Sequence, residues 1–214
     1  RGTTLTNIAT IYEQLKQYNQ VKKHLDWAAI ELKNSQDYRA IGEWNNNMGS
    51  YYFKTNDFDS AEKHWNAALL SFNKIDDQFG SFDTYFYLAT LKKEQNQINS
   101  ALQLALKAKE LADTTQVLEH QTKVEKLLGE LYELSKDVGL ALLHSKRYQA
   151  LKDSLVNQES IRKIAQAEMN FAFEKEKMKH QEALDKANNK QWFWALGILI
   201  LLLLFGLFYL QKKK

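Results

Sequence analysis

The chain has 214 residues, no cysteine, no proline and a net charge of +3. The absence of cysteine excludes disulfides, thiolate catalysis and cysteine metal sites, and the absence of proline favours long uninterrupted helices. Apart from the terminal lysines, residues 212–214, basic and acidic residues balance at 26 each, so the charge does not predict nucleic-acid binding.

A short pattern recurs every 40 residues along residues 1–153. Each copy begins with a bulky apolar residue and a small one: Ile8-Ala9, Met48-Gly49, Leu88-Ala89 and Leu128-Gly129. Twelve residues after each small residue stands another small or slim one: Val21, Ala61, Ala101 and Ala141. A fixed period in this range predicts stacked supersecondary units, with small residues where helices approach closely. We therefore predict about four helical hairpins.

The second copy shows the hairpin most clearly. Trp44, Met48 and Tyr52 recur at spacings typical of an amphipathic helix. The pair Asn56-Asp57 then interrupts the pattern, and Asp57 or Asp59 is expected to cap a second helix. That helix carries apolar residues on one face: Ala61, Trp65, Ala68, Leu69 and Phe72.

This second copy resembles the tetratricopeptide repeat. The resemblance is carried by Asn45-x-x-Met48-Gly49-x-x-Tyr52 and then by Phe58, Ala61, Trp65 and Ala68. It implies an all-α solenoid of helical hairpins over residues 1–153. The copies depart from that family in their longer period, in the lack of a closing proline and in Lys92, which replaces the aromatic of the third copy. Longer, proline-free repeats resemble those in sensor regions of bacterial membrane-bound regulators.

Residues 154–191 are predicted to form one charged helix, the stalk. Glu182 and Lys186 stand at the favourable i,i+4 spacing, and the apolar stripe is thin. A strict heptad fails because Glu168 and Lys175 occupy the seam that Ile161 would start. The stalk permits a coiled-coil homodimer without specifying one.

Residues 192–210 contain no charge and are predicted to span a membrane. Nineteen residues of helix cover about 28 Å, close to the thickness of a hydrocarbon core. Trp192, Trp194 and Tyr209 mark the two interfacial ends. The basic tail, residues 211–214, predicts a cytoplasmic C-terminus, so we expect a single-pass protein of the bacterial inner membrane with a periplasmic solenoid.

The junction Leu151-Lys152-Asp153-Ser154-Leu155 resembles that of Bacteroidetes-type membrane sensors. In that family, a tetratricopeptide array leads through a helix and one span to a histidine kinase, a cyclase or a DNA-binding regulator. The chain begins at Arg1 within a helical pattern, so we expect an upstream portion, and the resemblance implies an effector beyond Lys214.

The sequence predicts no catalytic residue, cofactor or metal site in this portion. It has no nucleophile elbow and no glycine-rich phosphate loop. His24, His64 and His144 recur at the repeat period, but packed helices lie roughly 8–10 Å apart, so equivalent positions cannot share one ion. We interpret them as repeat-position residues of the second helices.

The resemblance also predicts a binding surface, because the first helix of each hairpin lines the concave side in that family. Matched positions there are Glu43, Asn46, Ser50, Phe53, Lys54, Asp83, Phe86, Thr90, Lys93, Lys123, Lys126 and Glu130. Phe53 and Phe86 are either anchors for a peptide or packing residues between helices.

Two functions follow as expectations. The first is the protein- or peptide-binding sensor portion of a single-pass membrane signalling protein. The alternative is a membrane-anchored scaffold, complete at its C-terminus, that recruits or assembles partner proteins; tail-anchored insertion would then leave the solenoid in the cytoplasm.

Overall fold

The computed structural model describes the backbone of residues 1–212 and the side chains of residues 1–186 and 188–202. The chain divides into two units, Arg1–Val156 and Asn157–Lys214. The described residues form helices and no strand, which confirms the all-α prediction. The helices are α1 (Gly2–Gln14), α2 (Tyr18–Leu32), α3 (Tyr38–Lys54), α4 (Phe58–Asn73), α5 (Gln78–Glu94), α6 (Ile98–Thr115), α7 (Leu118–Leu134) and α8 (Val138–Lys212).

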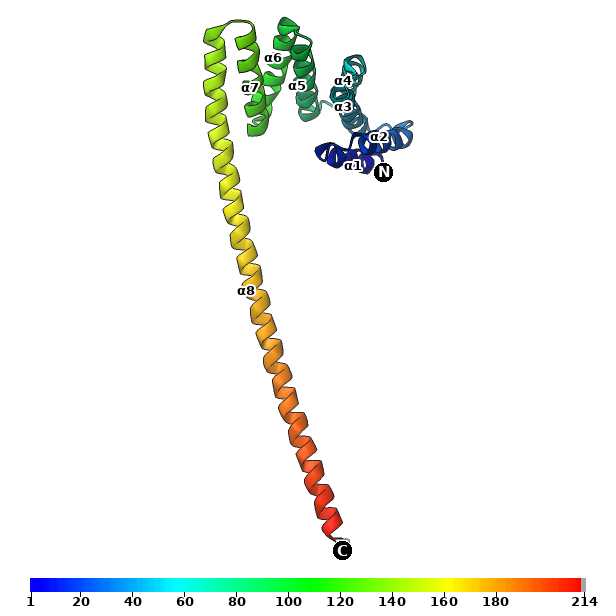
Figure 1. Ribbon diagram of the computed structural model, residues 1–214, viewed down its shortest axis with the longest axis vertical. Helices are drawn as coiled ribbons and strands as arrows, with labels where there is room; N and C mark the ends of the chain where they lie inside the picture. Colours follow the sequence, from blue (N-terminus) through cyan, green and yellow to red (C-terminus); the bar gives the residue numbers. More distant parts are fainter. Residues whose placement is uncertain (213–214) are drawn as a thin grey trace. The chain divides into compact units, whose positions relative to one another are not determined.

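The first unit consists of helix pairs with the predicted 40-residue period. The first helices end at Gln14, Lys54, Glu94 and Leu134, and the second helices begin at Tyr18, Phe58, Ile98 and Val138. Figure 1 shows the members of each of the first three pairs side by side. The array is therefore a stack of hairpins in the phase that the sequence predicts.

The turn inside each hairpin has one repeated geometry. Lys16, Asn56, Asn96 and Lys136 all have positive φ, between 57° and 65°. The amide of the following residue then donates to a carbonyl five residues earlier, as from Asp57 to Tyr52 at 2.9 Å. This closure satisfies carbonyls at the end of the first helix. Asp57 then caps α4 by accepting a hydrogen bond from the Ser60 amide at 3.1 Å.

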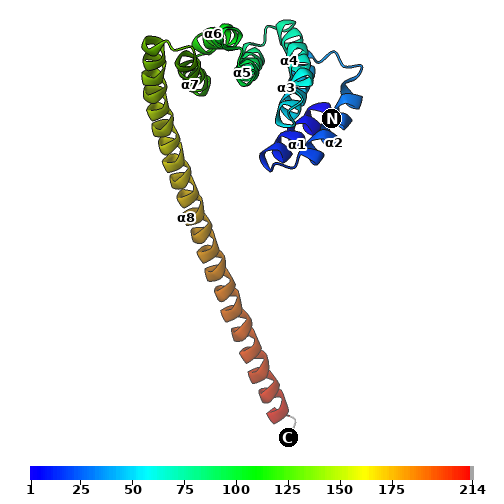
Figure 2. The ribbon, with the colours of Figure 1, turned by 45° about the horizontal axis from the view of Figure 1, so that its top comes forward.

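The first helix of each later pair packs against both helices of the pair before it. α1 contacts α3, α3 contacts α5, and α5 contacts α7, whereas α2 and α4 do not meet, nor do α4 and α6. The first helices therefore line the inner side of the curve that Figure 2 shows for α1–α7. Matched alanines make the close approach feasible: Ala9, Ala61, Ala89 and Ala101 are fully buried.

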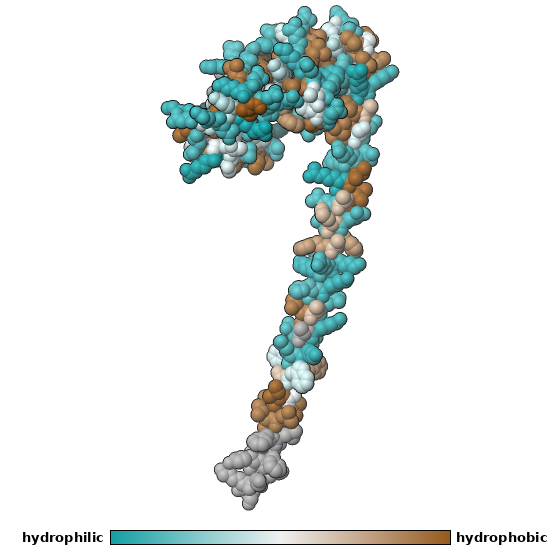
Figure 3. Space-filling view, turned by 180° about the vertical axis from the view of Figure 1, so that it is seen from behind, coloured by the Kyte–Doolittle hydropathy of each residue, from teal (hydrophilic) through white to brown (hydrophobic). Residues whose placement is uncertain are grey.

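The second unit is the continuation of α8, without a helix break at the predicted start of the stalk. This stretch contains no proline, and its two glycines, Gly197 and Gly206, do not by themselves end a helix. Apolar side chains along it are exposed, among them Ile161, Ile164 and Phe171. In Figure 3 this unit is mainly hydrophilic, and hydrophobic colour gathers just before the grey atoms.

The predicted span, residues 192–210, is only partly described. Trp192 and Trp194 are exposed, while Tyr209 lies among residues 203–210, whose side chains are outside the described set. Among the residues that the structure describes, no helical segment combines the length and the hydropathy of a membrane span.

Candidate functional site

A polar pocket lies on the inner side of the array, where α1, α3 and α5 meet. Its volume is about 310 Å³. Three of the predicted groove residues, Glu43, Asn46 and Asp83, line it together. The remaining lining residues are Thr6, Asn7, Arg39, Asn47, Phe72, Asp77, Phe79, Gly80 and Tyr87. We call this cavity the inner-face pocket.

Several residues that line the pocket occupy equivalent positions in successive repeats. Glu43 and Asp83 are 40 residues apart and come from successive first helices, and Asn7 and Asn47 are related in the same way. Equivalent positions of stacked helices lie side by side, so the period itself brings these groups into one cavity. Asn7, Asn47 and Tyr87 were not predicted as site residues, although they stand at matched positions of the same period.

The pocket carries an excess of negative charge. Arg39 neutralises Asp77 at its rim, with 3.2 Å between Nε and Oδ2. Glu43 and Asp83 have no ion pair or hydrogen bond from their side chains within residues 1–156. Burial raises the pKa of Glu43, against the influence of Arg39, and burial raises the pKa of Asp83, against the influence of Lys123. The two carboxylates thus lose hydration without gaining a direct cationic partner.

Asn46 supplies an amide to the wall of the pocket. It is 8% exposed, and its backbone carbonyl accepts a hydrogen bond from the Trp65 indole at 3.2 Å. The Thr84 hydroxyl lies 2.8 Å from Oδ1 of Asn46. The amide nitrogen of Asn46 has no partner within the described array, so this side chain retains hydrogen-bonding capacity toward the pocket.

Phe72 forms an apolar part of the pocket lining. Its ring is 1% exposed and lies between Gly42 of α3 and Gly80 of α5. A Cβ atom at either glycine would overlap the ring. The two glycines therefore allow α3 and α5 to close around Phe72 and fix the shape of the cavity.

The other predicted groove residues lie outside the pocket. Phe53 packs on Phe58 and Trp65, and Phe86 packs beside Phe82, so both rings are half-buried between helices. Their role as peptide anchors stays a prediction. The exposed Lys54 lies over the Phe53 ring, 5.9 Å from its centroid.

The charged residues predicted on α5 and α7 form ion pairs. Lys93 and Glu130 join the two helices at 2.7 Å, and Lys126 lies 3.9 Å from the same carboxylate. Lys123 pairs with Glu119 on its own helix at 2.8 Å. Ser50 and Thr90 are half-buried, and the Thr90 hydroxyl donates to the Phe86 carbonyl at 2.9 Å.

The repeat-position histidines stack on tyrosines. His24 lies on Tyr12, His64 on Tyr52 and His144 on Tyr132, with ring centroids 5.0, 5.4 and 5.2 Å apart. The third repeat has Lys92 and Leu104 instead. No group of three or more metal-binding side chains gathers in the described part of the chain.

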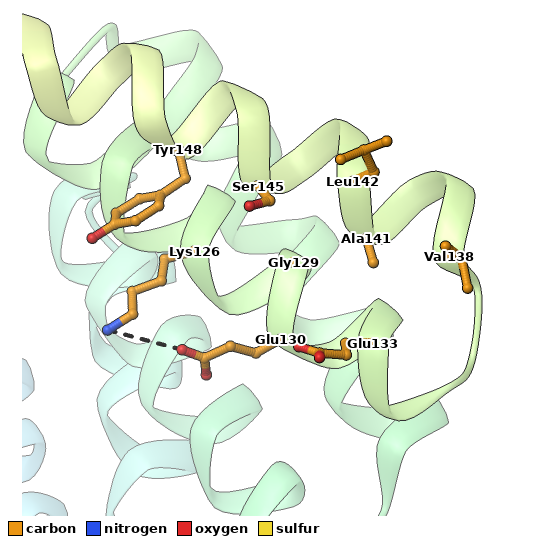
Figure 4. A pocket seen from close by; sticks show the side chains of 9 residues that line it. All are labelled: Lys126, Gly129, Glu130, Glu133, Val138, Ala141, Leu142, Ser145 and Tyr148. Carbon is orange, nitrogen blue, oxygen red and sulfur yellow. Dashed lines mark ion pairs between the residues drawn. The ribbon is translucent and has the colours of Figure 1, made fainter.

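A second cavity lies between α7 and the beginning of α8. Its volume is about 510 Å³, and we call it the end groove. Figure 4 shows its lining side chains, with Val138, Ala141 and Leu142 on α8 and with Glu130 and Glu133 along α7.

No protein-family model matches the chain, and no curated protein matches it. Among solved structures, the crystal structure of BtubC (BKLC) from P. vanneervenii is similar, with a TM-score of 0.63 and 16% sequence identity. The match covers 71% of this chain and 63% of BtubC, so the chain spans less than two thirds of that protein. At this identity, the likeness shows a shared helical repeat fold.

Proposed function

We propose that residues 1–156 bind a segment of a protein or peptide on the inner face of the array, as the input part of a single-pass membrane signalling protein. The observation that carries this proposal is the inner-face pocket, where Glu43, Asn46 and Asp83 converge from two first helices. Repeat arrays present extended concave surfaces of this kind to their partners.

The chemistry of the pocket favours a ligand with a basic side chain. Glu43 and Asp83 are partly desolvated carboxylates, and a lysine or arginine would give them the cationic partner that the array does not supply. Tyr87 and Phe79 add aromatic surface that suits the apolar stem of such a side chain. The amide of Asn46 is placed to bond the ligand backbone.

The remaining parts of the proposal rest on the sequence. The array would belong to the tetratricopeptide class, since the repeat pattern resembles it. Residues 192–210 would cross the inner membrane, with residues 211–214 in the cytoplasm and the array in the periplasm. The helix α8 would then connect the binding unit to the span and carry a change in the array toward it.

The ligand preference is tested by peptide display against the full chain in detergent. We expect the selected peptides to be enriched in lysine or arginine, and Glu43→Gln and Asp83→Asn each to weaken them roughly tenfold. Glu94→Gln is the matched control, because Glu94 is an exposed carboxylate on the same helix as Asp83. Selection without basic enrichment, or equal losses in all three variants, would contradict the proposal.

The membrane arrangement has a separate test. Protease added to intact spheroplasts should cleave within residues 1–156 while the C-terminal tail stays protected. Protection of the array until the membrane is opened would place it in the cytoplasm, as the scaffold alternative requires. The peptide selection would remain valid in either case.

A further inference from the structure

The end groove occupies the position of three grooves that are filled elsewhere in the array. α3 packs against α1 and α2, α5 packs against α3 and α4, and α7 packs against α5 and α6. Each hairpin therefore receives the first helix of the next one. The groove between α7 and α8 is open instead, with a volume of about 510 Å³.

Side chains in the end groove are more exposed than their repeat equivalents. Ala61 and Ala101 are fully buried, whereas Ala141 is only half-buried. Val138 is 77% exposed and Leu142 is 55% exposed, while Ile98 and Leu102, which stand 40 residues earlier, are half-buried. The exposed apolar surface is thus the surface that an incoming first helix covers in the other repeats.

The negative charge at the rim of the end groove indicates which residue a helix bound there would carry. In the third groove, Lys93 of α5 meets Glu130 of the incoming α7 at 2.7 Å. Glu133 holds the position of Lys93 in the fourth repeat, and no cation lies within ion-pair distance of it in the described part of the chain. The end groove therefore favours a helix with a basic residue where α7 has Glu130.

The chain does not contain such a helix among its own first helices. The positions equivalent to Glu130 are Thr10, Ser50 and Thr90, so none of the four carries a base there. The groove also differs in shape, because Tyr148 replaces the fully buried alanines at positions 28, 68 and 108. The occupant needs a small residue opposite Tyr148, and the first helices of a second copy of this chain do not match the rim.

We propose that the end groove binds an amphipathic α-helix of a different protein. The apolar stripe of that helix would cover Val138 and Leu142, and a lysine or arginine would face Glu133. The site continues the stacking interface of the array and is separate from the inner-face pocket. A helical partner would thereby contact the start of α8.

Two probe peptides test the proposal with the full chain in detergent. Both carry the 17-residue sequence of α7, locked as a helix by a lactam between Glu119 and Lys123, which already pair at 2.8 Å. One retains Glu130 and the other carries Glu130→Lys. Fluorescence anisotropy should show the lysine peptide binding roughly threefold more tightly, as expected for one partly exposed ion pair.

Protein variants separate specific docking from adhesion. Glu133→Lys should reverse the preference between the peptides, and Leu142→Glu should weaken the lysine peptide at least tenfold. Tyr148→Ala should tighten both peptides, because it restores the alanine of the other grooves. Glu133 and Leu142 are both exposed, so circular dichroism of these two variants should show an unchanged fold. No binding at about 1 mM to either the wild type or Tyr148→Ala, or a preference that Glu133→Lys leaves unchanged, would overturn the proposal.

Discussion

The Nδ1 atom of His144 lies 2.6 Å from Oε2 of Glu125, and both side chains are buried. Because a carboxylate only accepts hydrogen bonds, the imidazole donates. The same positions 80 residues earlier hold His64 and Asn45, which are 2.9 Å apart. Each pair links the second helix of a hairpin to the first, and in the fourth repeat this fixes the start of α8 against α7.

Loss of the Glu125 carboxylate should destabilise the array. Lys109 also reaches Glu125, at 3.2 Å, but it keeps Asp113 at 2.6 Å, so removal of the carboxylate leaves the buried His144 without its acceptor. We expect Glu125→Ala to lower the free energy of unfolding by about 3 kcal/mol. Chemical denaturation followed by tryptophan fluorescence measures this, with the exposed Glu94→Ala as the control. Equal stability of the two variants would show that the buried pair contributes nothing.

Substitution of two equivalent glycines should have opposite effects. A Cβ atom at Gly49 would overlap the Trp65 indole, so Gly49→Ala should cost about 1–3 kcal/mol. At Gly129 the nearest atom, the Ser145 amide nitrogen, would be 3.6 Å from the added carbon. Gly129→Ala should therefore stabilise by about 0.5–1 kcal/mol, because alanine suits a helix interior better than glycine. Melting temperatures that shift in the same direction would refute this account of the packing.

The architecture can be predicted from the sequence because small residues and turn residues recur at a fixed spacing. Ala61 and Ala101 are slim at matched positions, and the period places the breaks at Asn56 and Asn96. The sequence did not predict that α8 runs without interruption from the array into the stalk. No helix-breaking residue near Asp153 shows whether one helix ends there or continues. The array therefore ends without any local signal in the helix itself.

The candidate site was only partly predictable. Glu43, Asn46 and Asp83 follow from matched positions on the first helices. Phe79 enters from the beginning of α5, and Asp77 is positioned by its role as the α5 cap, with 3.1 Å to the Gly80 amide. Such contributions depend on how one hairpin rotates on the next, and the period does not determine that angle.

The half-buried Asp83 carboxylate predicts a pH-dependent stability. Burial raises the folded-state pKa of Asp83 above its ordinary value of 3.8, although Lys123 opposes the shift and Glu119 and Asp77 add to it. The folded chain then binds more protons than the unfolded chain, so this contribution is lost as the pH rises through the folded pKa. Asp83→Asn should therefore stabilise the array at pH 7, on the order of 0.5 kcal/mol after allowance for solvent screening.

Thermal denaturation at pH 7 and below pH 3.8 checks this sign. The stabilisation by Asp83→Asn should vanish at the lower pH, because Asp83 is then protonated and neutral, as asparagine is at any pH. A gain that persists unchanged at low pH would mean that burial of the charge is not its cause.

The two phenylalanines predicted as anchors should behave as packing residues in a stability assay. Phe53 is part of the cluster around Trp65, and Phe86 packs against the cluster around Phe82. We expect Phe53→Ala and Phe86→Ala each to cost about 2 kcal/mol of stability. Peptide binding by the folded fraction of each variant then shows whether the two rings also anchor a peptide. Undiminished affinity in both variants would remove the two rings from the binding surface.

The most direct measurement is a double-mutant cycle between Asp83 and the basic residue of a selected peptide. Titration calorimetry would compare the peptide and its lysine-to-norleucine analogue on the wild-type chain and on Asp83→Asn. We predict roughly a tenfold loss for the analogue on the wild type and a smaller loss, about threefold, on Asp83→Asn, because only Glu43 then remains to pair with the lysine. The same loss on both proteins would contradict the claim that the inner-face pocket receives a cationic side chain.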